Sequence, residues 1–175
     1  MIRATYINHM GDDLTVVNAA RVSFGKKVEA LGYTGADGGT MRPILHDRDI
    51  KLINYLAKHE HMSPFGHCFV SFHVKAPIFV ARQLVKHKFL RWNEISRRYV
   101  DDDPEFYVPK DWRGRALDKK QGSEGVVSIS GETMRVASKA SMWSVRNYRA
   151  LLNAGVAPEQ ARMVLPQSTM TEWYW

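Results

Sequence analysis

The chain has 175 residues, of which 45% are hydrophobic and 25% charged, a balance that excludes a disordered or fibrous protein and predicts a globular core. The single cysteine, Cys68, excludes an internal disulfide framework, and no apolar run reaches the roughly 18 residues of a membrane span, so we expect a cytoplasmic protein. The formal net charge of +7 favours an anionic partner, a requirement that nucleic acids and phosphorylated metabolites meet equally.

The N-terminal part of the chain is predicted to hold one strand and two helices. Asp12 or Asp13 suits the cap of the first helix, and Gly25 suits its end, because glycine readily adopts the left-handed backbone found there. The second helix is expected because apolar residues recur at helical spacing from Ile50 to Ala57. In chain order we expect a strand over 2–7, a helix over 12–25, a loop over 26–43, a helix over 46–61 and a turn over 62–67.

The middle of the chain carries the clearest strand, followed at once by a helix. Residues 67–75 alternate between two faces, and Cys68 falls on the apolar face, where a thiol would be inert. A helix is predicted over 77–90, because its first residue is proline, whose missing N–H costs little in a first turn. Gln83 and His87 are four residues apart on that helix and would share a face.

The C-terminal part is predicted to be a long loop followed by two helices. Residues 100–130 are first acidic and then rich in proline, glycine and serine, which is typical of a loop. A long helix is expected over 132–153, ended by Gly155, and Pro158 starts a shorter one. Strands and helices mix without a regular βαβ alternation, so the predicted fold is α+β, as a single domain over residues 1–175.

One stretch, residues 85–100, concentrates the polar chemistry. Its sequence, VKHKFLRWNEISRRYV, contains five cations, a histidine, an Asn-Glu pair and a serine. Arginine forks and a hydroxyl suit a phosphate group, whereas amide and carboxylate side chains suit the edge of a nucleobase. A nucleoside monophosphate would use both sets together. A solvated basic surface and a nucleic-acid contact would present the same residues, so this stretch alone leaves three interpretations open.

Three separated segments carry a resemblance to a known family. HMSPFGH, FHVKAPIFVARQLVKHKFLRWNEISRRY and EQARMVLP together resemble the flavin-dependent thymidylate synthases, whose signature is Arg-His-Arg, seven residues, and then Ser. The residues that match the longer pattern are Lys86-His87-Lys88, Asn93, Glu94, Ser96, Arg98 and Tyr99. Order and spacing hold from about Ala19 to the last residue.

The resemblance implies a fold, an assembly and a reaction. The fold would be α+β with a central, mostly antiparallel sheet packed with helices, in a homotetramer whose sites lie between subunits. FAD, reduced by NADPH, would pass a hydride while a methylene group moves from 5,10-methylenetetrahydrofolate to C5 of dUMP, giving dTMP or another 5-substituted product. Because the flavin carries the hydride chemistry, no protein nucleophile is required, which agrees with an inert Cys68.

The resemblance also implies which side chains hold the two ligands. The predicted FAD contacts are Ser23, His61, Ser63, Lys86, His87, Lys88, Phe89 and Glu94. The predicted dUMP contacts are Gln83, Glu94, Ser96, Arg97 (through its backbone), Arg98 and Arg162. Ser96 and Arg98 are expected at the catalytic centre, because two arginines and a hydroxyl would neutralise the phosphate dianion.

Two departures from the family pattern bear on these expectations. Lysines replace both arginines of the Arg-His-Arg signature, which keeps the charge but removes the planar forks that chelate phosphate. The family continues beyond the position of Trp175 to an arginine that polarises the uracil ring, and we expect this C-terminal segment to be lacking here. The alternative function is therefore a catalytically impaired flavin- or nucleotide-binding remnant, or one half of a split enzyme.

Two other interpretations have less support in the sequence. A basic nucleic-acid-binding module is favoured by charge alone, since no helix-turn-helix, zinc finger or aromatic platform for single strands is recognisable. The histidines at 59, 61 and 67 lie near Glu60, but their spacing fits no standard zinc pattern, so no metal site is expected.

Overall fold

The computed structural model describes residues 1–35, 41–87, 90–118, 120 and 122–175. These residues form two compact units, which we name the sheet unit (Met1–Thr5 with His73–Trp175) and the hairpin unit (Tyr6–Phe72). Both units combine helices with antiparallel strands, which confirms the predicted α+β class. That the whole chain is a single domain stays a prediction. Within the described residues, no helix is long and apolar enough to cross a membrane.

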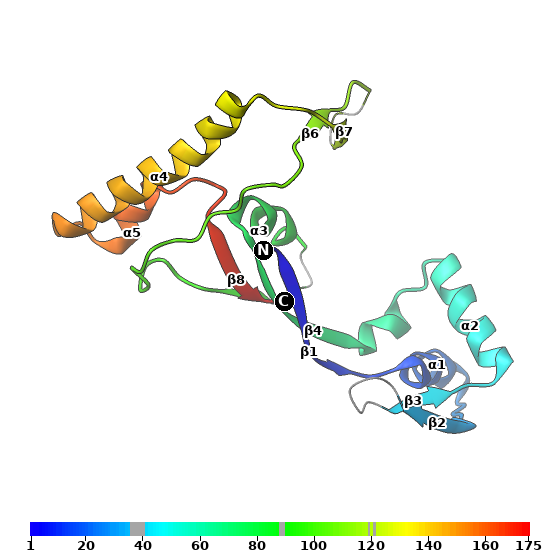
Figure 1. Cartoon of the computed structure of the whole chain (residues 1–175). Helices are drawn as coiled ribbons and strands as arrows, with labels where there is room; N and C mark the ends of the chain where they lie inside the picture. The colour runs from blue at the N-terminus through cyan, green and yellow to red at the C-terminus, as the bar shows by residue number, and fades with distance from the viewer. Residues whose placement is uncertain (36–40, 88–89, 119, 121) are drawn as a thin grey trace. The chain divides into compact units, whose positions relative to one another are not determined.

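The hairpin unit contains two helices and a short hairpin (Figure 1). Its first helix begins as predicted: Asp12 accepts a hydrogen bond from the backbone N of Thr15 at 2.8 Å, and the Thr15 hydroxyl accepts one from the N–H of Asp12 at 3.2 Å. Gly25 ends the helical stretch with a φ of 63°. In chain order the elements are the end of β1 (Arg3–Met10), α1 (Asp13–Arg21), a 3₁₀ turn (Val22–Phe24), β2 (Gly32–Gly35), β3 (Met41–Ile44), α2 (Asp47–Lys58) and a 3₁₀ helix (Ser63–His67).

The predicted loop over 26–43 is wrong in its second half, where β2 and β3 form an antiparallel hairpin. Its register joins Gly32 to Ile44 and Gly35 to Met41. Most side chains of both strands are exposed, so backbone pairing holds this hairpin and leaves little apolar alternation in the sequence to reveal it. Residues 36–40 lie outside the described residues.

A close backbone approach joins the start of α1 to the end of the 3₁₀ helix in the hairpin unit. Gly11 has a φ of +79°, and a Cβ placed there would lie 2.8 Å from Cys68 Sγ and 2.9 Å from the carbonyl oxygen of His67. The Cys68 thiol donates to the Asp12 carbonyl at 3.5 Å. Burial, reinforced by the charges of Asp12 and Asp13, raises the pKa of this thiol, which supports the prediction that it is inert.

The sheet unit is built around the strand β8 (Met170–Tyr174). In the four-stranded sheet, ordered β1-β4-β8-β5, β8 lies between β4 (Phe69–Pro77) and β5 (Asn93–Glu94) and is antiparallel to both. Trp173 lies opposite Val74 on one side and Glu94 on the other, and it is only 1% exposed. The neighbouring Ala76 and Met170 are also buried, so the core of this unit sits where β4 and β8 pair.

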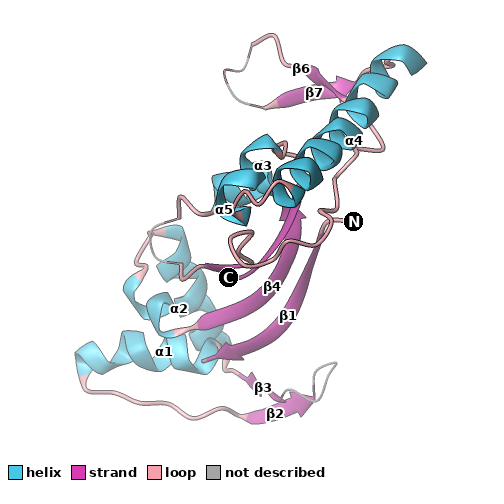
Figure 2. Ribbon diagram, turned by 90° about the vertical axis from the view of Figure 1, so that its left-hand side faces the viewer, coloured by secondary structure: helices cyan, strands magenta, loops and turns pink. Residues whose placement is uncertain are grey.

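Three helices accompany this sheet: α3 (Ile78–Leu84), α4 (Gly131–Asn153) and α5 (Pro158–Ala161). The predicted long helix is confirmed as α4, capped by Ser130, whose hydroxyl accepts from the backbone N of Thr133 at 3.1 Å. It ends just before Gly155, which has a φ of 81°. α4 and α5 lie side by side in both views (Figures 1 and 2).

The helix predicted over 77–90 is shorter than expected. It ends at Leu84 with Val85 as its cap, so Gln83 and His87 do not share a helical face and that part of the prediction is wrong. A helix of seven residues is held by its packing rather than by propensity. Asn93–Glu94, further along the chain, form β5 and pair with β8.

The predicted loop over 100–130 contains a second antiparallel hairpin, β6 (Arg113–Arg115) and β7 (Ser123–Val126), and is wrong there. Ion pairs anchor the acidic start of the loop. Glu105 lies 2.6 Å from Lys75 Nζ, and Asp103 accepts a hydrogen bond from Arg149 Nε at 2.8 Å. Each cation lowers the pKa of its carboxyl partner.

Candidate functional site

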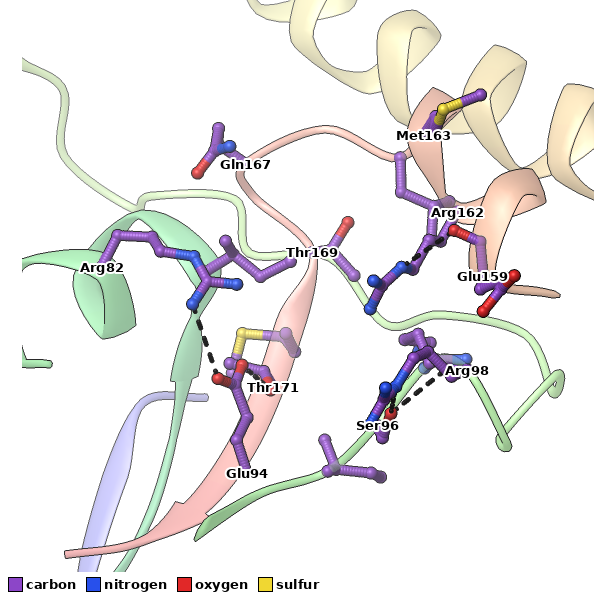
Figure 3. A pocket seen from close by; sticks show the side chains of 15 residues that line it. Arg82, Glu94, Ser96, Arg98, Glu159, Arg162, Met163, Gln167, Thr169 and Thr171 are labelled. Atoms are coloured by element: carbon purple, nitrogen blue, oxygen red, sulfur yellow. Dashed lines mark hydrogen bonds and ion pairs between the residues drawn. The ribbon is translucent and has the colours of Figure 1, made fainter. Parts of the chain in front are cut away.

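A cavity of about 560 Å³ lies in the sheet unit (Figure 3). Its walls come from α3, from β5 and the turn after it, from α5 with the 3₁₀ turn Arg162–Val164, and from β8 with the loop before it. The charged residues that line it are Arg82, Arg97, Arg98, Arg162, Glu94 and Glu159. The volume suits a small ligand, and the excess of arginine over glutamate favours an anion.

Ser96, Arg98 and Arg162 lie together at one end of the cavity, which we call the anion end (Figure 3). The backbone N and Nε of Arg98 donate to Ser96 Oγ at 3.3 and 3.2 Å, and Arg162 Nε donates to the Glu159 carbonyl at 3.1 Å. Among the residues that the structure describes, no carboxylate lies within 4.0 Å of either guanidinium. Two positive charges and a hydroxyl therefore remain for an anionic ligand.

The turn after β5 explains how these groups are presented. The backbone N–H groups of Tyr99 and Val100 both donate to the Ser96 carbonyl, at 3.0 and 3.1 Å, which closes a tight turn that begins at Ser96 and includes Arg97 and Arg98. The guanidinium of Arg97 is held by Asp102: it donates to the Asp102 carbonyl at 2.6 Å and to the Asp102 carboxylate at 3.3 Å. Its side chain thus braces the turn, and the predicted dUMP contact through its backbone stays a prediction.

The other end of the cavity is organised around Glu94 (Figure 3). Thr171 Oγ1 donates to Glu94 Oε1 at 2.7 Å, and Trp92 Nε1 donates to Glu94 Oε2 at 3.0 Å. Arg82 lies 3.7 Å from Oε2. The cavity therefore has a cationic end and an end built on an oriented carboxylate.

Among the predicted flavin contacts of the sheet unit, Lys86 and His87 lie just beyond α3, and Glu94 lies in the cavity wall. Lys86 Nζ donates to Gln83 Oε1 at 3.2 Å, and the ring of His87 lies 6.3 Å from that of Trp175. Gln83, a predicted dUMP contact, does not line the cavity in this chain. Lys88 and Phe89 lie outside the described residues.

The remaining predicted flavin contacts lie in the hairpin unit and are exposed. Ser23 is in the 3₁₀ turn after α1, and Ser63 begins the 3₁₀ helix. His61 lies in an aromatic cluster, with its ring 6.0 Å from Tyr55 and 6.4 Å from His59. In the part of the chain that the structure describes, no three His, Cys, Asp or Glu side chains are grouped to hold a metal ion.

Sequence reasoning missed several residues that line the cavity: Arg82, Glu159, Gln167, Thr169 and Thr171. Arg82 had a detectable signal, because it stands directly before the predicted contact Gln83. The threonines had none. Thr171 lies in β8, which pairs with β5, a strand of only two residues. Thr169 lies in the loop before β8, where it forms an isolated bridge with Phe106.

The fold and the cavity together define a class of protein. The sheet unit presents two arginines and a serine at one end of a cavity and an oriented carboxylate at the other. These are the groups that a small phosphorylated molecule with further polar groups would need. A nucleoside monophosphate has this chemistry.

Comparison with known proteins narrows the class to a family. The family model described as thymidylate synthase complementing protein matches residues 5–175, and the chain belongs to this family. The flavin-dependent thymidylate synthase of Thermus thermophilus is 44% identical over 169 residues, which are 97% of this chain and 57% of that protein. The namesake from Kosmotoga olearia is 44% identical over 170 residues, 95% of this chain and 66% of its own length. The chain thus spans less than two thirds of these relatives.

Solved structures show the same fold. The UMP/dUMP methylase PolB from Streptomyces cacaoi, bound with 5-Br dUMP, matches with a TM-score of 0.78 and 33% identity, over 99% of this chain and 72% of that one. The same methylase bound with 5-Br UMP matches with a TM-score of 0.72 and 34% identity, over 99% and 70% of the two chains.

Proposed function

We propose that this chain carries the nucleotide- and flavin-binding region of a flavin-dependent thymidylate synthase, which methylates dUMP to dTMP. The observation that carries the proposal is the pair Arg98 and Arg162, which face one end of the cavity beside Ser96 without a carboxylate partner among the described residues. Family membership and the relatives' names support it.

In this proposal the nucleotide lies along the cavity. Its phosphate would accept hydrogen bonds from Ser96, Arg98 and Arg162, and its nucleoside part would extend toward Glu94. Such an arrangement matches charge to charge at one end and places an acceptor against hydroxyl or imide N–H donors at the other. These residues would orient the nucleotide and neutralise its charge. No protein nucleophile is required in this proposal, because the flavin would carry the hydride chemistry.

Each of the two units also offers side chains that fit FAD as the cofactor. In the sheet unit Lys86 offers an ammonium, and Glu94 offers a carboxylate. In the hairpin unit Ser23 and Ser63 offer exposed hydroxyls, while His61 offers a ring within an aromatic cluster. When bound, the reduced flavin would supply the hydride. NADPH and 5,10-methylenetetrahydrofolate as co-substrates, a homotetramer and a cytoplasmic location belong to the same proposal.

Binding measurements test the proposal directly. Isothermal titration calorimetry should show that the chain binds dUMP at least about 100-fold more tightly than deoxyuridine, because a lost phosphate removes two charge-assisted contacts. Equal affinity for the two ligands would refute a phosphate site at Arg98 and Arg162. Release of tritium from C5-labelled dUMP, dependent on FAD, NADPH and methylenetetrahydrofolate together, would establish the complete reaction.

A second candidate substrate is UMP. It is favoured by the similarity to a methylase whose name includes both UMP and dUMP. The two candidates differ only in the ribose 2′-hydroxyl, so competition between UMP and dUMP for the same site separates them. Tighter binding of UMP would make a ribonucleotide the substrate.

A further inference from the structure

Both carboxylate oxygens of Glu94 are occupied by donors from the protein. Thr171 Oγ1 donates to Oε1 at 2.7 Å, and Trp92 Nε1 donates to Oε2 at 3.0 Å. Glu94 is only 18% exposed, and Thr171 is 5% exposed. Two donors on a partly buried carboxylate fix its rotation, which a single contact would leave free.

The strand register explains why these groups meet. Glu94 lies opposite Trp173 in the antiparallel pair of β5 and β8, so Thr171, two residues before Trp173, is its diagonal neighbour on the same face. Trp92, two residues before Glu94, stacks on Trp173 with ring centroids 4.6 Å apart and planes at 19°. Since Trp173 is 1% exposed, this stacking holds the indole of Trp92 in place and directs its N–H at Glu94.

We propose that Thr171 is a positioning residue, whose hydroxyl, together with the Trp92 indole, holds the Glu94 carboxylate as an acceptor aimed at the nucleoside part of the ligand. This inference rests on the proposed nucleotide site and assigns a role inside it. Thr171 does not act on the anion end, where Ser96, Arg98 and Arg162 make hydrogen bonds of their own. Its contribution is therefore specific to ligands that reach Glu94.

Valine is the sharpest substitution, because it has the shape of threonine and lacks the hydroxyl. Thr171→Val leaves no buried donor unpaired, so packing in β8 is preserved, and Glu94 Oε1 loses its protein donor. Thr171→Ser removes a methyl group and keeps the hydroxyl. If the position mattered only for packing, valine would be tolerated better than serine.

The experiment compares two ligands on four proteins. Binding of dUMP is measured by calorimetry, and binding of inorganic phosphate by phosphorus NMR titration. The proteins are the wild type, Thr171→Val, Thr171→Ser and, as a control outside the cavity, Ser144→Ala, which removes a hydroxyl bonded to the Ala140 carbonyl on α4. We expect Thr171→Val to weaken dUMP about tenfold, the scale of one hydrogen bond to a charged group, and to change phosphate affinity by less than about twofold. Thr171→Ser should recover most of the dUMP affinity, and Ser144→Ala should match the wild type.

Several results would overturn the inference. Unchanged dUMP binding in Thr171→Val would show that the hydroxyl does not serve the ligand, and equal losses for dUMP and phosphate would show a general structural role. Failure of Thr171→Ser to recover binding would assign the effect to the methyl group. These outcomes all presuppose a wild type that binds dUMP. A wild type that binds none would refute the proposed function itself, and the positioning role with it.

Discussion

Replacing Arg98 by alanine should weaken dUMP far more than it weakens deoxyuridine. Arg98 supplies one of the two guanidinium groups at the anion end, and among the described residues it competes with no carboxylate for its donors. A hydrogen bond to a charged partner is worth about 1.5–3 kcal/mol. Because the Arg98 side chain is exposed in the free chain, solvent screening places the expected loss near 2 kcal/mol, which is about 30-fold in affinity.

The assay is calorimetric titration of both ligands at two salt concentrations. The loss should shrink at high salt, since screening weakens the phosphate–guanidinium attraction that was removed. Arg146→Ala is the matched control, because Arg146 is an exposed arginine of α4, packed over the Trp143 ring and outside the cavity. The reasoning is refuted if Arg98→Ala weakens deoxyuridine as much as dUMP, or if Arg146→Ala has an equal effect.

Three further predictions concern stability and reactivity. Gly11→Ala should lower the free energy of unfolding, measured in urea titrations, by about 2 kcal/mol or more, because Gly11 has a positive φ and an added Cβ would meet Cys68 Sγ. The control Gly66→Ala should lower it far less, because an added Cβ there meets open space. Glu105→Gln should cost about 0.5–1 kcal/mol at pH 7, through loss of the pair with Lys75. The folded-state pKa of Glu105 is depressed, so this contribution is present above its ordinary value of 4.5, and the gap to the wild type should close as the pH falls below 4.5 in acid-unfolding curves. Cys68 should react with a thiol reagent more slowly than free cysteine at pH 8, because burial raises its pKa; an equal or faster rate would contradict this.

The helices with strong local signals were predictable. Asp12 caps α1, Gly25 ends the 3₁₀ turn that follows α1, and Gly155 follows the end of α4, because caps and left-handed glycines act within one turn of the chain. The short strands could not be predicted from the sequence. β5 has two residues and the β2–β3 hairpin is mostly exposed, so neither leaves a periodic pattern.

The residues of the candidate site were also predictable only in part. Ser96, Arg98 and Arg162 were expected from a resemblance spread over separated segments, and the structure brings them to one end of a cavity. The cavity's other end went unpredicted except for Glu94. Arg82 approaches that carboxylate from α3, and Thr171 approaches it across the diagonal of the β5–β8 pair. Neither contact joins residues that are neighbours in the sequence.

By itself, the sequence determined the fold class, the family and the types of side chain available for a phosphorylated ligand, because composition, caps and motif spacing are local properties. Only the tertiary structure decided which of those side chains face the cavity. Arg97 and Arg98 both line the cavity, but the guanidinium of Arg97 is bonded to Asp102 while that of Arg98 faces the anion end. Gln83 lies outside the cavity, whereas Arg82 lines it. Adjacent residues point in different directions along a strand, turn or helix. Which of two neighbours faces the cavity therefore depends on the pairing of β8 with β5 and on the early end of α3.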